Sequence, residues 1–146
     1  MRSNQPSIAD TLPGIMIPDC DYDRLVELAR GTERSMPQVS EYLSRELARA
    51  QVVAQPAIDP QVARIGSRIS YREDQSGRQR AVTLVWPQDA DLERNRLSVL
   101  TSIGAALLGM RPGQSIDWPA PIGGARTLTV LTVDNGMPDP GPGRAA

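Results

Sequence analysis

Acidic residues and the single cysteine gather near the start of the chain, where their types and spacing could hold a metal ion or carry acid–base chemistry. Asp19, Asp21 and Asp23 lie on either side of Cys20. At the beginning of a helix such carboxylates serve more simply as N-caps that complement the helix dipole, and we favour this interpretation. The same carboxylates should raise the pKa of the Cys20 thiol, so Cys20 is expected to be unreactive.

The chain contains no histidine. This removes the commonest general base, the usual partner of a nucleophilic Ser or Cys, and the commonest metal ligand. A glycine-containing run, GAALLG at 104–109 followed by RPGQS, lacks the Lys-Ser/Thr pair and the spacing of a phosphate loop. We therefore predict no catalytic residue, no metal, no cofactor and no small-molecule substrate.

Arginine supplies all 16 basic residues, and the formal net charge is −1. Neither half of the chain is basic enough to attract nucleic acid by charge alone. Five arginines nonetheless follow one another with only Glu73 and Asp74 opposing them: Arg64, Arg68, Arg72, Arg78 and Arg80. A solvated sheet face is the preferred interpretation, and a surface for an acidic or phosphate-bearing partner is the alternative.

Two amphipathic helices are predicted in the first third of the chain. Asp19 or Asp21 can cap a helix over 22–30 that Gly31 ends, and Ser35 can cap a second helix over 36–51 with Pro37 in its first turn. Because the linker between them is short, the helices should lie antiparallel as a stubby hairpin. The apolar run at 15–17 before Pro18 can form an edge strand or a plug against the first helix.

Beyond the Pro-containing linker at 55–60 the apolar period changes to two. SRISYRE and RAVTLVW flank a turn at 74–77 and predict a β-hairpin. Leu97 and Val99 suggest a third strand, 103–108 a short helix and Pro112-Gly113 a turn, while 115–118 and 126–133 complete about five strands. Trp86 and Trp118 should pack in or beside the core. The predicted class is α+β, a helical hairpin and an antiparallel sheet covered by one short helix.

The ends of the chain, 1–13 and 135–146, are polar or rich in Pro and Gly, and we expect both to be flexible. A lone cysteine cannot form an internal disulfide, and the chain opens without the apolar stretch of a signal peptide or membrane span. A cytoplasmic protein without a membrane partner is expected.

The segment LSVLTSIGAALLGMRPGQSIDWPAPIGGARTLTVLTV, residues 97–133, resembles the C-terminal domain of the Gre transcript-cleavage factors. The continuous GAALLG, the turn at Gly113, Trp118 and the short N-terminal helices ending in SRELARAQ are more similar to the Rnk group, which is named for regulation of nucleoside diphosphate kinase. The resemblance covers about 14–133. It implies a short helical hairpin at 14–54, an FKBP-like body at 55–134, and binding to RNA polymerase near the rim of its secondary channel, with nucleic acid contacted at most through the polymerase.

Two departures from the Gre pattern limit the expected activity. Gre factors carry an acidic pair at the tip of a long coiled coil, whereas the expected tip here offers only Glu33 beside Arg34. The family's docking motif, an acid followed by Ser-Pro, falls on Leu100, Thr101 and Ser102, so both the acid and the proline are missing here. We therefore expect a regulator that occupies the channel entrance and competes with Gre factors without cleaving transcripts. A peptidyl-prolyl isomerase is the alternative, which the absence of Phe disfavours.

Overall fold

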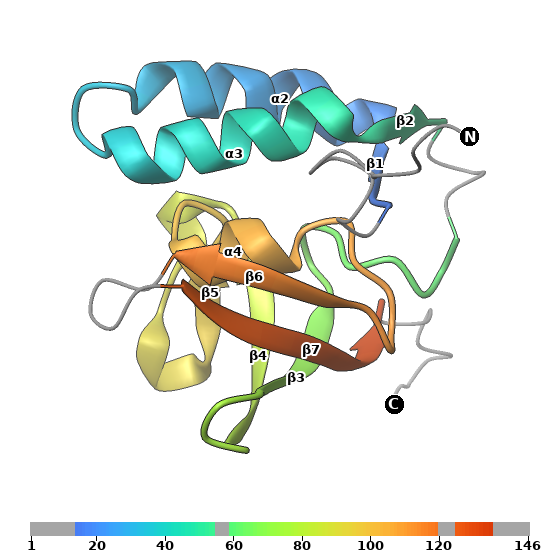
Figure 1. The fold of residues 1–146 in the computed structure, drawn as a ribbon. Coiled ribbons are helices and arrows are strands. Elements are labelled where there is room, and N and C mark those ends of the chain that lie inside the picture. Colours follow the sequence, from blue (N-terminus) through green and yellow to red (C-terminus); the bar gives the residue numbers. More distant parts are fainter. Residues whose placement is uncertain (1–13, 55–58, 120–124, 136–146) are drawn as a thin grey trace, which may run out of the picture.

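A computed structural model of the chain describes residues 14–54, 59–119 and 125–135. Two helices, α2 (Asp19–Gly31) and α3 (Pro37–Arg49), lie side by side over a body made of a β-sheet and the short helix α4 (Ser102–Leu107) (Figure 1). The α+β class is therefore confirmed. The predictions made for residues 1–13, for the first part of the linker, 55–58, and for residues 136–146 lie outside the described residues.

The hairpin helices form where apolar spacing and Pro37 place them, but their predicted caps were wrong. Helix α2 follows the extended Pro18 directly, so Asp19 and Asp21 occupy its first turn instead of preceding it. Pro37 takes the first position of α3, which makes Met36 the residue before the helix and leaves Ser35 one residue too early. Neither N-cap residue makes a side-chain cap hydrogen bond.

A short parallel ribbon closes the base of the hairpin. Strand β1 (Met16–Pro18) precedes α2, strand β2 (Gln51–Val53) follows α3, and the two pair in parallel. The apolar run was expected as a strand, but its partner was not foreseen. Gly109 permits this arrangement, because a Cβ atom there would lie 2.6 Å from Cβ of Ile15, and its φ of +81° suits glycine.

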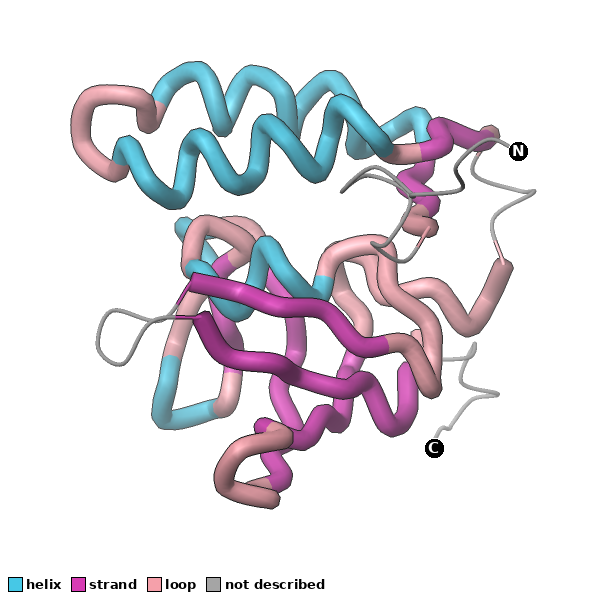
Figure 2. Tube along the Cα trace, in the orientation of Figure 1, coloured by secondary structure: helices cyan, strands magenta, loops and turns pink. Residues whose placement is uncertain are grey.

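The body is a five-stranded sheet in the order β5-β4-β3-β7-β6, shown in magenta in Figure 2. Its strands are β3 (Arg68–Glu73), β4 (Gln79–Val85), β5 (Arg96–Ser98), β6 (Ser115–Pro119) and β7 (Ala125–Asp134). The purely antiparallel sheet that we predicted is wrong at one edge, where β5 pairs in parallel with β4. Two 3₁₀ turns, Pro87–Asp89 and Leu92–Arg94, carry the chain back so that both strands run the same way.

Two glycine turns appear where the sequence placed them. Gly113 has a φ of +90°, and the Gln114 amide donates to the Arg111 carbonyl at 3.1 Å, which confirms the Pro-Gly turn. Gly77 has a φ of +74° and closes the β3–β4 hairpin. The register between β3 and β7 shifts by one residue between Ser70 and Tyr71, a bulge that nothing in the local pattern predicted.

Hairpin and body share one hydrophobic core. Fully buried side chains from the hairpin side, such as Leu25 and Leu43, join Leu107, Leu84 and Leu128 from the body in a single cluster. Asn135, the first residue of the tail that we expected to be flexible, belongs with the body. Its amide donates to the carbonyls of Val62, at 3.1 Å, and Pro60, and its side-chain oxygen accepts from the Ser67 hydroxyl.

Candidate functional site

The turn at the end of the hairpin, residues 31–36, holds the first pair of predicted site residues. Glu33 and Arg34 are both exposed there. The turn is closed by the hydroxyl of Thr32, which donates to the carbonyls of Leu28 and Ala29 at 3.0 and 3.1 Å, and by the Met36 amide, which donates to the Thr32 carbonyl at 2.8 Å. The tip therefore presents one carboxylate beside a guanidinium.

The hairpin reaches only a short way from the body. Each helix has 13 residues, which corresponds to about 20 Å of α-helix. Much of that length lies along the body, since α3 packs on α4 and both helices contribute to the common core. The hairpin is therefore short, and the single carboxylate at its tip cannot supply the pair of carboxylates that would hold a catalytic metal ion.

The segment 100–102, where the resemblance places the docking motif, serves first to begin helix α4. The Leu100 side chain is buried with 7% of its area exposed. Thr101 caps α4: its hydroxyl accepts from the Gly104 amide and donates to the Ser98 carbonyl, both at 2.9 Å. Ser102 is half-buried at the first position of the helix. Of the three residues, only Thr101 and Ser102 have appreciable exposed surface for a partner.

Gly104 makes this tight start possible. A Cβ atom at Gly104 would lie 2.2 Å from the Ser98 carbonyl oxygen and 2.9 Å from Oγ1 of Thr101. The first glycine of GAALLG is thus explained by the close packing of the helix start against Ser98 and Thr101.

The acidic group near Cys20 has a structural role in this fold. Asp19 and Asp21 lie in the first turn of α2, where carboxylates complement the helix dipole. The pKa of Asp21 is raised because burial outweighs the attraction of Arg64. Burial, followed by the charge of Asp21, also raises the pKa of Cys20, so the predicted direction is confirmed. The described residues contain no group of three or more Asp, Glu, Cys or His placed to hold a metal ion.

The arginine run does not form one surface. Arg68 and Arg72 alternate with the buried Ile69 and Tyr71 and so point to the outer side of the sheet. Arg80 pairs directly with Tyr71 across the β3–β4 ladder and therefore lies on the opposite side of the sheet. The expectation that several of these arginines share the outward face of this hairpin thus holds for only part of the run.

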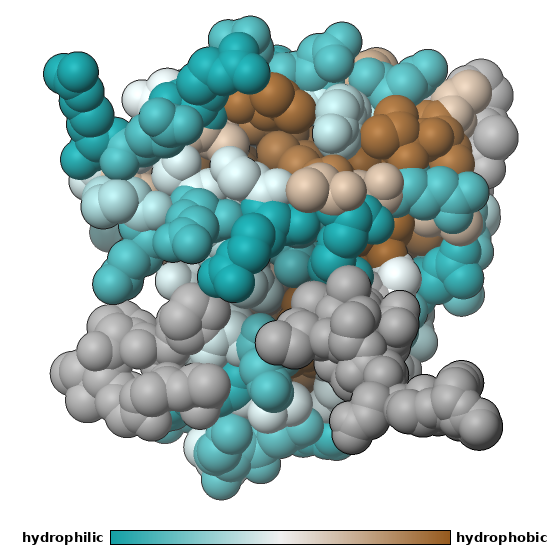
Figure 3. Space-filling model, turned by 45° about the horizontal axis from the view of Figure 1, so that its top comes forward, coloured by the Kyte–Doolittle hydropathy of each residue, from teal (hydrophilic) through white to brown (hydrophobic). Residues whose placement is uncertain are grey.

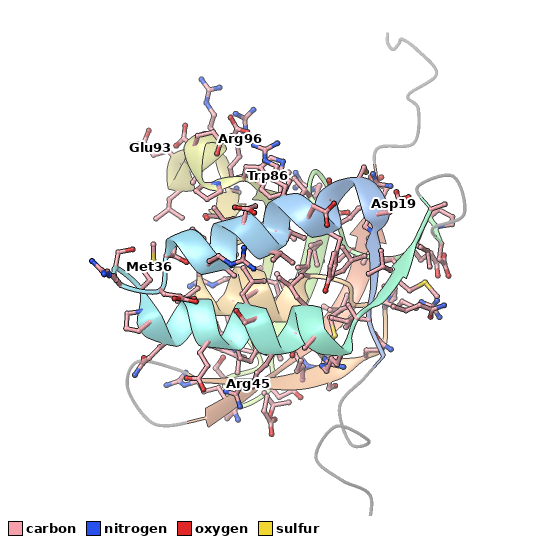
Figure 4. The ribbon with its side chains drawn as sticks, turned by 90° about the horizontal axis from the view of Figure 1, so that it is seen from above. Asp19, Met36, Arg45, Trp86, Glu93 and Arg96 are labelled. Atoms are coloured by element: carbon pink, nitrogen blue, oxygen red, sulfur yellow. The ribbon has the colours of Figure 1, made fainter. Side chains whose placement is uncertain are left out.

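An aromatic contact between hairpin and body was missed by sequence reasoning. The guanidinium of Arg24 on α2 lies 4.0 Å from the ring centroid of Trp86, which follows β4. In Figure 4 Trp86 lies beside α2, and Glu93 and Arg96 project from the same corner of the body. Leu92, in the same connection between β4 and β5, is 77% exposed. No local signal could pair Arg24 with Trp86, because the two residues are 62 positions apart in the sequence.

A buried ion pair lies on α3 where the hairpin meets the body. Glu46, only 3% exposed, accepts two hydrogen bonds from Arg49, at 2.8 and 3.2 Å. Burial raises the pKa of Glu46, although Arg49 acts in the opposite direction. Glu46 is three residues from Leu43 and so shares its helix face, a spacing by which sequence reasoning could have found it. The hydroxyl of Tyr42 donates to the Asp117 carbonyl at 3.4 Å, and burial raises its pKa strongly.

The outward side of the hairpin is hollowed between its helices. A groove of about 290 Å³ is lined by residues of both helices and by Glu33 of the turn: Tyr22, Val26, Ala29, Arg30, Glu33, Ser44, Leu47 and Ala48. In Figure 3 brown hydrophobic surface gathers over the hairpin and is bordered by teal polar side chains. No helix of the described residues is long and apolar enough to cross a membrane.

Comparison with known families shows the class of protein to which this two-helix hairpin and five-stranded body with α4 belong. Residues 58–135 match the family model described as "Transcription elongation factor, GreA/GreB, C-term", and residues 13–53 match the model of the Rnk N-terminus. A solved structure titled as a prokaryotic transcription elongation factor GreA/GreB from Nitrosomonas europaea is 37% identical, with a TM-score of 0.65, and the match covers 84% of this chain and 98% of that one.

The curated relatives differ in how much of their own length this chain matches. The "Regulator of nucleoside diphosphate kinase" of Escherichia coli (strain K12) is 35% identical over 122 residues, which are 84% of this chain and 90% of the relative. The "Transcription elongation factor GreA" of Roseiflexus castenholzii is 36% identical over 87 residues, but the match spans only 55% of that protein. The chain belongs to the Rnk group of the GreA/GreB transcription-factor family.

Proposed function

We propose that this protein is a regulator that binds RNA polymerase near the rim of the secondary channel and competes there with Gre factors without cleaving transcripts. The observation that carries the proposal is the combination of a GreA/GreB-type body with a hairpin of two 13-residue helices whose tip offers the single carboxylate of Glu33. Binding by the body can then occupy the entrance, while the chemistry that needs paired carboxylates is missing.

The contact surfaces within this proposal are the α4 start and the hairpin tip. Thr101 and Ser102 have partly exposed surface beside the core residue Leu100, and Glu33 and Arg34 are exposed at the tip. Contact with nucleic acid is indirect, through the polymerase, and the cytoplasm is the expected location. The name of the Escherichia coli relative adds an association with the regulation of nucleoside diphosphate kinase to this proposal.

Co-sedimentation with core RNA polymerase tests the proposal. We expect the protein to bind the core enzyme, to be displaced by excess Gre factor, and to leave the transcripts of backtracked complexes uncleaved. Replacement of Ser102 by arginine, which adds a bulky charge at the α4 start, should weaken binding. The same replacement at Ser44, an exposed position on α3, is the matched control and should not. Absence of binding, or binding that a Gre factor does not displace, would refute the proposal.

A peptidyl-prolyl isomerase is the second candidate, and it is not favoured. The likeness of the body to the FKBP fold remains a prediction, and the curated relatives are named as regulators and elongation factors. An isomerase needs an aromatic-lined pocket, but the groove between the hairpin helices is lined by a single aromatic side chain, Tyr22. We expect the protein not to accelerate prolyl cis–trans isomerisation in a proline-isomerisation assay.

A further inference from the structure

A second hollow lies at the joint between the hairpin and the body. It measures about 350 Å³ and is lined by residues of three segments: Gly14, Ile15 and Met16, then Arg49 and Gln51, then Arg111 and Gln114. In Figure 1 this is the region where β1 and β2 approach the orange connection from α4 to β6. The Met16 amide donates to the Gly109 carbonyl there, at 3.4 Å. A molecule in the hollow would contact hairpin and body together.

The wall of this hollow carries positive charge and hydrogen-bond donors. Two of its seven residues are arginines, two are glutamines, and none is acidic, while each arginine also pairs with a carboxylate next to the hollow, Arg49 with Glu46 and Arg111 with Asp59. The guanidinium is a planar fork of donors that matches the oxygen geometry of phosphate and carboxylate groups. Met16 is half-buried and adds apolar surface beside these donors, whereas the Ile15 side chain is buried in the core.

The Arg49 side chain and the turn that carries Arg111 are both held in place. Glu46 binds Arg49 through both carboxylate oxygens, so the guanidinium is oriented by a buried partner. Arg111 begins the turn that Gln114 closes: its amide donates to Oε1 of Gln114 at 2.9 Å, and Nε2 of Gln114 donates to the Gly14 carbonyl at 3.4 Å. A binding site whose donors are fixed beforehand loses less entropy when a ligand binds.

The present partners of the Arg111 guanidinium are weak enough to be exchanged. Its Nη2 lies 3.5 Å from Oδ2 of Asp59, in a pair whose side chains are 40% and 37% exposed, and 3.4 Å from the sulfur of Met16. Exposed ion pairs contribute little, and a thioether is a weak acceptor. A doubly charged oxyanion would be a better partner for this guanidinium than either group.

We propose that this hollow binds a small organic phosphate. The phosphate group is bound by Arg111 and Arg49 with the side-chain amides of Gln51 and Gln114, and the organic part packs on the exposed part of Met16. The volume lies at the lower end of the range for small-molecule sites, roughly 300–1,000 Å³, so the ligand is compact. The bound ligand ties the base of the hairpin to the 111–114 turn. The proposal does not depend on binding to RNA polymerase.

Titration of the full chain followed by amide NMR tests the proposal. The probes are glycerol 3-phosphate, adenosine monophosphate, inorganic phosphate and succinate. We expect at least one organic phosphate to bind saturably at one site, to shift the amides of Gly14, Gln51 and Gln114, and to bind more tightly than inorganic phosphate or succinate. Replacement of Arg111 by glutamine should weaken this binding at least about tenfold, since a charged hydrogen-bond partner is lost.

Arg94 offers a matched control. It is also an arginine in a weak ion pair, 3.7 Å from Asp91, and it lies in the turn before β5, outside the hollow. Arg94→Gln should leave the affinity unchanged. The proposal is overturned if neither organic phosphate binds, if Arg111→Gln and Arg94→Gln weaken binding equally, or if inorganic phosphate or succinate binds as tightly as the organic phosphates. Each of these results leaves the polymerase proposal untouched, because that is tested by co-sedimentation.

Discussion

Replacing Arg49 by methionine should strongly destabilise the protein, because it leaves the Glu46 carboxylate buried without its ionic partner. Glu46 is 3% exposed and Arg49 is 16% exposed, and the two are joined by hydrogen bonds of 2.8 and 3.2 Å. Removal of one partner from a buried ion pair costs about 3–5 kcal/mol. Since Arg49 retains some contact with water, we expect the lower end, about 3 kcal/mol, which corresponds to roughly a 10 °C fall in Tm.

The loss of unfolding free energy caused by Arg49→Met should depend on pH. Burial raises the pKa of Glu46 in the folded protein above its ordinary value, and Arg49 opposes this rise. A carboxyl with a raised folded pKa stabilises the fold below its unfolded pKa, and that contribution is lost as the pH rises through the folded pKa. In the Arg49→Met variant the opposing charge is gone, so the pKa of Glu46 should be raised further. The difference in unfolding free energy between Arg49→Met and wild type should therefore be smaller at about pH 4, where Glu46 takes up a proton, than at about pH 7.

Urea denaturation followed by tryptophan fluorescence measures both effects, since Trp118 is buried and Trp86 is half-buried. The double replacement of Glu46 by leucine and Arg49 by methionine is the control, because exchanging a whole buried pair for apolar side chains is often neutral or stabilising. A loss below about 1 kcal/mol for Arg49→Met at pH 7, or an equal loss at both pH values, would refute the reasoning.

Three further replacements test other contacts. Gly104→Ala should destabilise the protein by about 1–3 kcal/mol in thermal unfolding, because the added Cβ would overlap the Ser98 carbonyl. Gly31→Ala is the control and should have no such effect, since no atom lies within 4 Å of the added Cβ. Equal effects of the two replacements would contradict this packing argument. Thr101→Ala should cost about 1 kcal/mol through loss of the α4 cap, and Thr101→Ser should retain most of it; a neutral alanine variant would speak against the cap. Arg24→Gln should cost about 0.5–1 kcal/mol and change the emission of Trp86, and an unchanged spectrum would argue against the stacked contact.

Local pattern was sufficient for the elements whose causes lie within a few residues. The helix that begins at Pro37, the β3–β4 hairpin around Gly77 and the turn at Gly113 were predicted because apolar period, proline and positive-φ glycine act at short range. The caps failed for an equally local reason, since the prolines at 18 and 37 set where each helix begins. For the candidate site, the sequence foresaw a tip with one carboxylate, and the structure shows Glu33 exposed there.

The sequence by itself determined the class of this protein: the α+β pattern and the residues of its C-terminal segment suffice to assign the family. Tertiary structure alone decided which side chains and which strands meet. Arg24 contacts Trp86, β1 pairs with β2, and β5 lies beside β4 in parallel. It also decided that Leu100 and Glu46 are buried. The physical reason is that pairing across the fold depends on how hairpin and sheet pack together around one core, and no short stretch of sequence carries that information.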